Sequence, residues 1–173
     1  LRKELEDNGV KDILVLPLYP HYAMSSYETV VEKVKEEVYE NFPNIKIDIV
    51  PHFYNNSNYI DLLSSKISFS IKDIEYDHIL FSYHGIPVSH LKISDPTNSH
   101  CYKVENCCSV NSLAHKTCYK HQCLETTRLV TEKLNIEKDK YSNSFQSRLP
   151  NEPWLKPYTC LLYTSPSPRD RYG

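Results

Sequence analysis

The sequence is short of glycine, lacks any long apolar run and carries almost no excess of either charge. Its 173 residues include three glycines and one methionine. No stretch of about eighteen or more apolar residues occurs, so we expect no transmembrane span. No signal peptide opens the sequence. The formal net charge of −2 gives no electrostatic reason to expect nucleic acid or an anionic membrane as a partner.

The composition, with 40% hydrophobic and 24% charged residues, is that of a soluble globular protein. Strand-like and helix-like segments alternate, which favours an α/β fold with a parallel sheet and right-handed crossovers. The aliphatic run at 12–20 predicts a strand buried on both faces. Serines begin an amphipathic helix at 25–42. Further strands are expected at 45–53, 76–87 and 140–149, and further helices at 1–12, 56–74 and 124–136.

The two ends of the sequence differ from the rest. The chain starts at Leu1 inside a helical pattern, and we expect that this is not the native start. After Thr159 it reads CLLYTSPSPRDRYG, without periodicity and with a Ser-Pro repeat. This stretch is similar to translated sequencing-adaptor read-through, so we interpret 160–173 as a non-native tail, with a flexible natural terminus as the alternative. Cys160 is then not counted among the functional residues.

His84 ends the expected strand within HILFSYHGIP. Ligands of open α/β sheets bind beyond the carboxyl ends of the strands, and an imidazole there accepts a proton or ligates a metal near neutral pH. We expect Gly85 to allow an unusual backbone angle and Pro87 to stop any helix. From position alone, a histidine that is only hydrogen-bonded at the sheet edge is equally consistent.

Three blocks of the sequence resemble, in order and spacing, signature blocks of the ferrochelatases: LVLPLYPHYAMSSYETV, LFSYHGIPVSHLKISDP and SFQSRLPNEPWLKPYT. Ferrochelatases insert Fe²⁺ into a porphyrin to form haem. Their two similar Rossmann-like α/β halves face each other across a porphyrin cleft. The resemblance implies the end of a first half at 1–52, the larger part of a second half at 53–159, and a cytoplasmic location. It also implies a fragment that is inactive alone, because the family's amino-terminal porphyrin contacts and carboxy-terminal glutamate are missing.

The resemblance further implies the site residues. His84 matches the family's active-site histidine, which takes a pyrrole proton, ligates the incoming Fe²⁺, or does both. Two N–H protons must leave the porphyrin as iron enters, and a positioned base accelerates such a step by roughly a hundred- to ten-thousand-fold. The expected substrate-binding residues are Tyr19, Phe145, Gln146, Ser147, Arg148 and Trp154.

Three of these six substrate-binding residues have a structural alternative. Trp154 is also consistent with core packing. Arg148 fits a structural ion pair as well as a porphyrin propionate. Tyr19, with its neighbours His21 and Tyr22, fits a role in shaping the loop after a strand. The remaining histidines that we interpret as surface or core residues are His52, His78 and His90.

Segment 101–123 contains five of the six cysteines. The spacing matches neither the paired C-x2-C of a zinc ribbon nor a plant-type ferredoxin, and reduced cytosolic thiols disfavour disulfides. Some ferrochelatases carry a [2Fe–2S] cluster on cysteines, so the resemblance implies one here. Zinc held partly by His115 and His121, or free thiols, are the alternatives. The implied cluster ligands are Cys101, Cys108 (or Cys107 in its place), Cys118 and Cys123.

Two rival functions stay open from the sequence. One is a related chelatase that inserts cobalt or nickel into a different tetrapyrrole. The other is a non-catalytic iron–sulfur or zinc-binding module, for which the cysteine segment is the whole argument.

Overall fold

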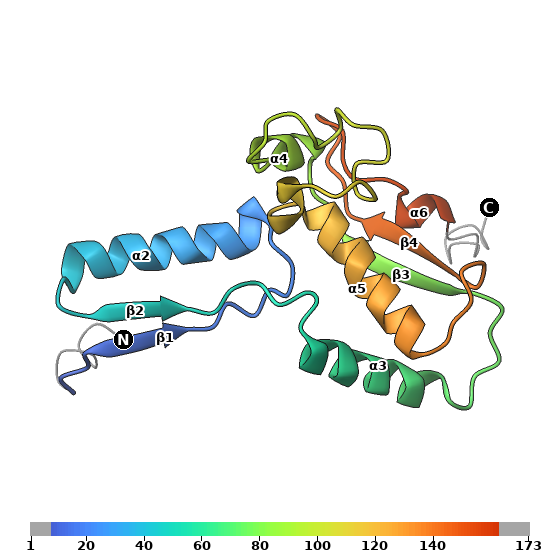
Figure 1. Ribbon diagram of the computed structural model, residues 1–173, viewed down its shortest axis with the longest axis horizontal. Coiled ribbons are helices and arrows are strands. Elements are labelled where there is room, and N and C mark those ends of the chain that lie inside the picture. The colour runs from blue at the N-terminus through green and yellow to red at the C-terminus, as the bar shows by residue number, and fades with distance from the viewer. Residues whose placement is uncertain (1–7, 163–173) are drawn as a thin grey trace, which may run out of the picture.

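Two pairs of parallel strands form the scaffold of the protein (Figure 1). The structure, a computed structural model, describes residues 8–162. Strand β1 (Asp12–Val15) pairs with β2 (Lys46–Ile49), and β3 (Ile79–His84) pairs with β4 (Tyr141–Gln146). Parallel strands separated by helices confirm the predicted α/β class.

Helices lie between the paired strands in the sequence, and α3 (Ser57–Ile71) lies between the two pairs. Helix α2 (Thr29–Asn41) runs alongside β1 and β2, while α3 and α5 (Tyr119–Lys133) contact each other beside the second pair (Figure 1). The shorter elements are the π-helix η1 (Met24–Glu28), α4 (Val88–Ile93), the 3-10 helix η2 (Leu113–Lys116) and α6 (Thr159–Leu162).

Two helices begin differently from the prediction. The expected serine cap is not formed, because Met24–Glu28 is a π-helix without a side-chain hydrogen bond at its cap. Helix α5 begins at Tyr119 rather than near 124, because Cys118 caps it and its Sγ accepts the backbone N–H of His121 at 3.5 Å. Cysteine is not one of the preferred capping residues, so the local pattern did not indicate this start.

The expected features at the two ends fall mainly outside the described residues. Residues 1–7 of the expected first helix and residues 163–173 of the expected tail lie there. Within the described part, Asn8 and Gly9 form a turn, and the first residues after Thr159 belong to α6.

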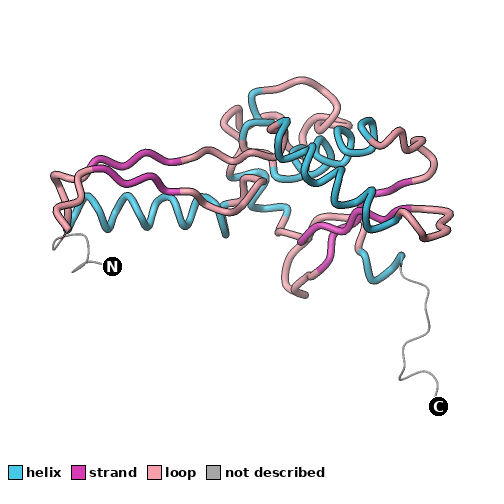
Figure 2. The backbone as a smooth tube through the Cα atoms, turned by 90° about the horizontal axis from the view of Figure 1, so that it is seen from below, coloured by secondary structure: helices cyan, strands magenta, loops and turns pink. Residues whose placement is uncertain are grey.

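The β1–β2 pair is open to solvent, against the expectation for 12–20. Leu14, Leu16 and Leu18 are 70%, 54% and 77% exposed. Helix α2 lies along one side of the pair, where Val31 and Val38 are buried. Figures 1 and 2 show no second layer from the described part of the chain on the other side. The prediction of a strand buried on both faces is therefore wrong.

The main core lies where α4 and α5 meet β4. Leu91 of α4, Cys123 of α5, Phe145 of β4 and Leu155 of the following loop are all at most 1% exposed. The loop after β1 is tied to the same core, because the backbone N–H of Tyr22 donates to Gln122 Oε1 at 2.7 Å. The loop that follows β1 therefore reaches the carboxyl end of β3 beside α5.

Candidate functional site

His84 is the last residue of β3, opposite Gln146 of β4. Its Nδ1 lies 2.6 Å from the carbonyl oxygen of Gly85. A carbonyl only accepts, so Nδ1 carries the ring proton of the neutral imidazole and Nε2 keeps its lone pair. The hydroxyl of Tyr119 donates to the His84 carbonyl at 3.0 Å. Backbone and ring are thus both held, with one nitrogen left to accept a proton or ligate a metal.

Gly85 is required for a different reason from the one expected. The φ angle of Gly85 is not positive. Of the glycines in the described residues, Gly9 is the one with a positive φ. A Cβ at Gly85 would lie 2.8 Å from the carbonyl oxygens of both Gln146 and Ser147, which is closer than side chains approach backbone. The Gly85 N–H donates to the Gln146 carbonyl at 2.6 Å. Glycine therefore lets the two strand ends approach closely.

A cleft of about 380 Å³ adjoins His84 and the loop that follows β1. It brings His84 together with Tyr19, one of the residues expected to bind substrate. Ile86 and Tyr119 supply part of its wall from the other side. The cleft is lined by Tyr19, Pro20, His21, Ala23, Ser25, Ser26, His84, Ile86 and Tyr119.

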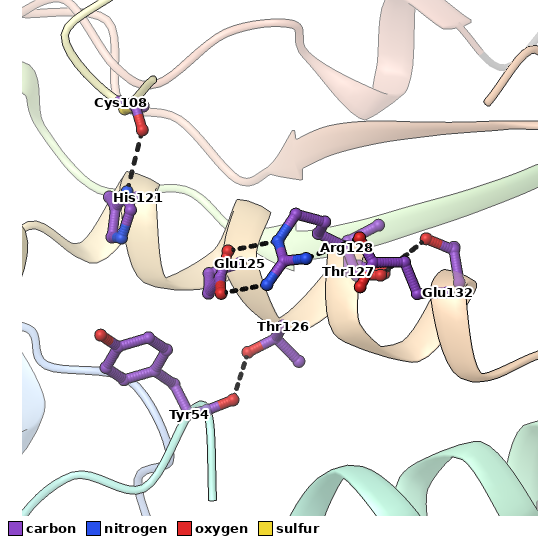
Figure 3. A network of polar contacts seen from close by, with 9 residues as sticks. Tyr54, Cys108, His121, Glu125, Thr126, Thr127, Arg128 and Glu132 are labelled. Carbon is purple, nitrogen blue, oxygen red and sulfur yellow. Dashed lines mark hydrogen bonds and ion pairs between the residues drawn. The ribbon is translucent and has the colours of Figure 1, made fainter. Parts of the chain in front are cut away.

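His21 is a cleft residue that sequence reasoning assigned only to loop shape. Its Nε2 lies 2.9 Å from Thr126 Oγ1, whose hydroxyl donates to the Tyr54 carbonyl at 2.8 Å (Figure 3). Nε2 is therefore the donor. Burial, with a smaller repulsion from His52, lowers the pKa of His21 to about 4, so the ring is neutral at physiological pH.

Residues 145–148, at the end of β4 and directly after it, line a second hollow of about 290 Å³ and not the His84 cleft. Phe145 is buried in the core, while Gln146, Ser147 and Arg148 are exposed. The Arg148 guanidinium lies over the Tyr158 ring, 4.8 Å from its centroid. The predicted substrate residues are therefore divided between two neighbouring surfaces.

Trp154 lies beneath the turn that follows His84. Its ring approaches Gly85, with Cε3 3.4 Å from the position of an added Cβ, and its backbone bridges to Pro87. The residue is half-buried, and its Nε1 is buried without a partner in residues 8–162. Trp154 thus supports the His84 turn.

Three cysteines of segment 101–123 bring their sulfur atoms together. The Cys118 side chain is hydrogen-bonded to those of Cys108 and Cys101. The bond from Cys108 is the main cause that lowers the pKa of Cys118 to about 6. Burial raises the pKa of Cys101 to about 12, and the bond to Cys118 followed by burial raises that of Cys108. The thiolate form of Cys118 is thus stabilised by two neighbouring thiols.

Cys123 is separate from these three. It lies within α5, is fully buried, and its side chain is hydrogen-bonded to Tyr119. Burial raises the pKa of its thiol. No group of three or more His, Cys, Asp or Glu residues within 8–162 has a geometry that could hold a metal ion as the chain stands.

The two histidines considered as zinc ligands contact backbone carbonyls instead. His115 Nε2 lies 3.0 Å from the carbonyl of Cys107, and His121 Nδ1 lies 2.9 Å from that of Cys108 (Figure 3). Their rings are stacked, with centroids 3.6 Å apart. Each of these nitrogens is a donor, so only the other ring nitrogen, Nδ1 of His115 and Nε2 of His121, is left to ligate a metal.

Asp95 anchors the start of the cysteine segment. Its Oδ2 accepts the backbone N–H groups of His100 and Cys101, each at 2.9 Å, and its Oδ1 accepts the N–H and hydroxyl of Thr97. Burial alone would raise its pKa, but these hydrogen bonds outweigh burial and hold the pKa well below its usual range. Asp followed by Pro and Thr is a turn signal that could have identified this anchor from the sequence.

None of the helices in the described part of the chain is long and apolar enough to cross a membrane.

Comparison with known proteins gives a consistent result. A family model described as Ferrochelatase matches residues 2–165. A protein of Opitutus terrae named Ferrochelatase is 45% identical over 152 residues, which cover 88% of this chain and 44% of that protein. A protein of Pseudomonas fluorescens strain Pf0-1 with the same name is 41% identical, over 87% of this chain and 44% of that protein. The chain thus spans less than half the length of these relatives.

Proposed function

The chain belongs to the ferrochelatase family, and on that premise we propose that it contributes the metal-insertion residue of an enzyme that inserts Fe²⁺ into a porphyrin to form haem. The observation that carries the proposal is the state of His84. Its Nδ1–H is bonded to the Gly85 carbonyl, and its Nε2 is left with a lone pair.

In the proposed reaction the porphyrin loses two N–H protons as Fe²⁺ enters. His84 Nε2 accepts a proton from a pyrrole nitrogen, and a base placed in this way supplies roughly a hundred- to ten-thousand-fold in rate. The hydrogen bond from Tyr119 to the His84 carbonyl holds the strand end in place. Because Nε2 has one lone pair, its contact with the incoming Fe²⁺ precedes its protonation, and the second pyrrole proton leaves to solvent at the exposed strand end.

We propose that Tyr19 contacts the porphyrin from the wall of the cleft. The block Phe145–Arg148 and Trp154 are the other proposed substrate residues. The exposed guanidinium of Arg148 has the planar, bidentate geometry that binds a propionate. Trp154 acts by supporting the turn at Gly85.

The same proposal divides the chain into the end of one chelatase half, at 1–52, and the larger part of the other half, at 53–159. It also holds that this fragment is inactive by itself. Support comes from the coverage of the relatives, 44% of their length. A cytoplasmic location also stays a prediction, which cell fractionation would test.

We also propose a [2Fe–2S] cluster on the cysteine segment. Contact between the sulfur atoms of Cys101, Cys108 and Cys118 supports it. For the fourth ligand we propose Cys107, because it is half-buried next to Cys108 in the chain, whereas Cys123 is enclosed in the core. A cluster there would supply a one-electron redox centre.

The iron-insertion proposal is tested by metal choice in the full-length enzyme that carries this segment. The purified protein is assayed anaerobically with a porphyrin and Fe²⁺, Co²⁺ or Ni²⁺ in turn, by the change in porphyrin absorption. We expect turnover with Fe²⁺. Turnover restricted to cobalt or nickel with another tetrapyrrole would favour the related chelatases, and metal binding without any turnover would favour a binding module.

A further inference from the structure

We infer that His21, held by Thr126, is a positioning residue that fixes the loop after β1 and thereby places Tyr19 against the porphyrin. The inference deepens the proposed function and rests on it, since Tyr19 is a proposed substrate contact. His21 does not act on the reacting atoms. Its contribution is to hold part of the wall of the cleft that also contains His84.

One face of α5 carries three side chains that contact the loop after β1. Tyr119, Gln122 and Thr126 are three and four residues apart, which places them in one row along the helix. The His21 ring meets the Tyr119 ring edge to face, with centroids 5.8 Å apart. Gln122 and Thr126 are 0% and 1% exposed. The loop is therefore held by buried groups of a single helix.

His21 and Thr126 belong to a directed chain of hydrogen bonds. The Thr126 hydroxyl donates to the Tyr54 carbonyl at 2.8 Å, so towards His21 its oxygen can only accept (Figure 3). The Nε2–H of His21 donates to that oxygen at 2.9 Å. Thr126 thus joins the loop after β1 to the segment after β2, which contains Tyr54. Removing either the donor or the acceptor breaks this link.

A second hydrogen bond holds the same loop one residue later. The backbone N–H of Tyr22 donates to Gln122 Oε1 at 2.7 Å. The Gln122 amide is fixed in turn, because its Nε2 donates to the carbonyls of His115 and Lys116 at 3.2 and 2.9 Å. Two consecutive residues of the loop are thus attached to α5, one by its side chain and one by its backbone. Buried polar networks satisfied in this way specify a single arrangement.

His84 is held by contacts of its own. The Tyr119 hydroxyl donates to the His84 carbonyl, and the Nδ1–H of His84 is bonded to the Gly85 carbonyl. Neither bond involves the loop after β1. Loosening the loop should therefore displace Tyr19 and leave the proton acceptor in place. Loss of an interaction that contributes equally to substrate and transition state raises KM and leaves kcat unchanged, so the effect should appear in the KM for the porphyrin.

The test uses matched substitutions in the full-length enzyme that carries this segment. His21→Phe keeps an aromatic ring beside Tyr119 and removes the donor, whereas His21→Gln keeps an N–H near the position of Nε2. Thr126→Val keeps the shape of the side chain and removes its oxygen. Thr131→Val is the control, because Thr131 is equally buried in α5 but its hydroxyl bonds carbonyls of its own helix. Melting temperatures check that each variant is folded.

Two readouts are measured on each variant: steady-state insertion of Fe²⁺, and binding of protoporphyrin alone by fluorescence titration. We expect His21→Phe and Thr126→Val each to raise the KM and the Kd for the porphyrin roughly three- to ten-fold, with kcat within about two-fold of wild type. The double variant should show the same rise as either single one, because both changes break one hydrogen bond. His21→Gln and Thr131→Val should stay within about two-fold of wild type.

Three results would overturn the inference. An unchanged KM and Kd in His21→Phe would show that the loop keeps its place without this hydrogen bond. A fall in kcat with KM unchanged would show that His21 acts on the chemistry. A double variant whose KM rises by the product of the two single effects would show that His21 and Thr126 act separately.

Failure of the proposed function is distinguishable from failure of the inference. Wild-type enzyme that binds protoporphyrin but inserts no Fe²⁺ would remove the iron-insertion proposal, while the Kd values of the variants would still decide the role of His21. Wild-type enzyme that binds no porphyrin would overturn both.

Discussion

The two strand pairs of this protein are built alike and buried very differently. In the β1–β2 pair Leu14 is 70% exposed, and Leu18 in the loop after β1 is 77% exposed. In the β3–β4 pair, Ser144 and Phe145 of the polar strand YSNSFQ are 0% and 1% exposed. The apolar strand lies in solvent and the polar strand enters the core. Burial is therefore decided by the layers that cover a strand, which the strand's own composition does not specify.

The core of the second pair should be the most sensitive to truncation. Phe145→Ala removes a side chain that is 1% exposed and contacts the Tyr83 ring. Large-to-small changes of this kind cost about 3–5 kcal/mol in the free energy of unfolding. Chemical denaturation of the variant and wild type measures the difference. A loss below about 1 kcal/mol would show that this core is not the stabilising one.

Asp95→Ala should give the next largest effect, and the effect should depend on pH. The change leaves the N–H groups of His100 and Cys101 without their acceptor, at a cost of about 1–3 kcal/mol. The folded-state pKa of Asp95 is lowered, so its contribution is present at neutral pH and is lost progressively as the pH falls from about 4 toward that lowered pKa. The difference in melting temperature between variant and wild type should therefore be constant from pH 7 to about pH 5 and become smaller toward pH 3. A difference that stays constant down to pH 3 would contradict this.

The open strand pair should respond least. Leu14→Ser alters a side chain that is 70% exposed, so the free energy of unfolding of this chain should change by no more than about 0.5 kcal/mol. Thermal unfolding of the wild-type chain and of its Leu14→Ser variant, each comprising residues 1–173, measures the change. A loss comparable with that of Phe145→Ala would show that the Leu14 side chain is covered, and the contrast between the two pairs would disappear.

The sequence predicts the alternation of strands and helices well, because apolar periodicity and turn residues are local signals. It does not predict the π-helix at Met24–Glu28 or the cysteine cap of α5, since neither has a strong local signature. The burial of 12–20 was predicted wrongly, because the apolar composition of a strand does not show whether another layer covers it.

The site was predictable in part. His84 follows from its place at a strand end together with the resemblance of three blocks, and the structure brings Tyr19 to the same cleft. The hydrogen bonds of His100, His115 and His121 were not predictable, because their partners are backbone carbonyls, and backbone acceptors leave no mark on residue spacing. Asp95 was signalled by its Asp-Pro-Thr turn, which sequence reasoning did not use.

The central claim is that His84 serves as the proton acceptor in iron insertion. Its most direct test compares His84→Ala with His78→Ala in the full-length enzyme, because these two histidines flank the same strand and His78 lies at its other end. Anaerobic insertion of Fe²⁺ into a porphyrin is followed for both variants, with melting temperatures as the check on folding. We predict a loss of roughly a hundred- to ten-thousand-fold for His84→Ala and wild-type turnover for His78→Ala. Turnover of His84→Ala within about three-fold of wild type would contradict the account.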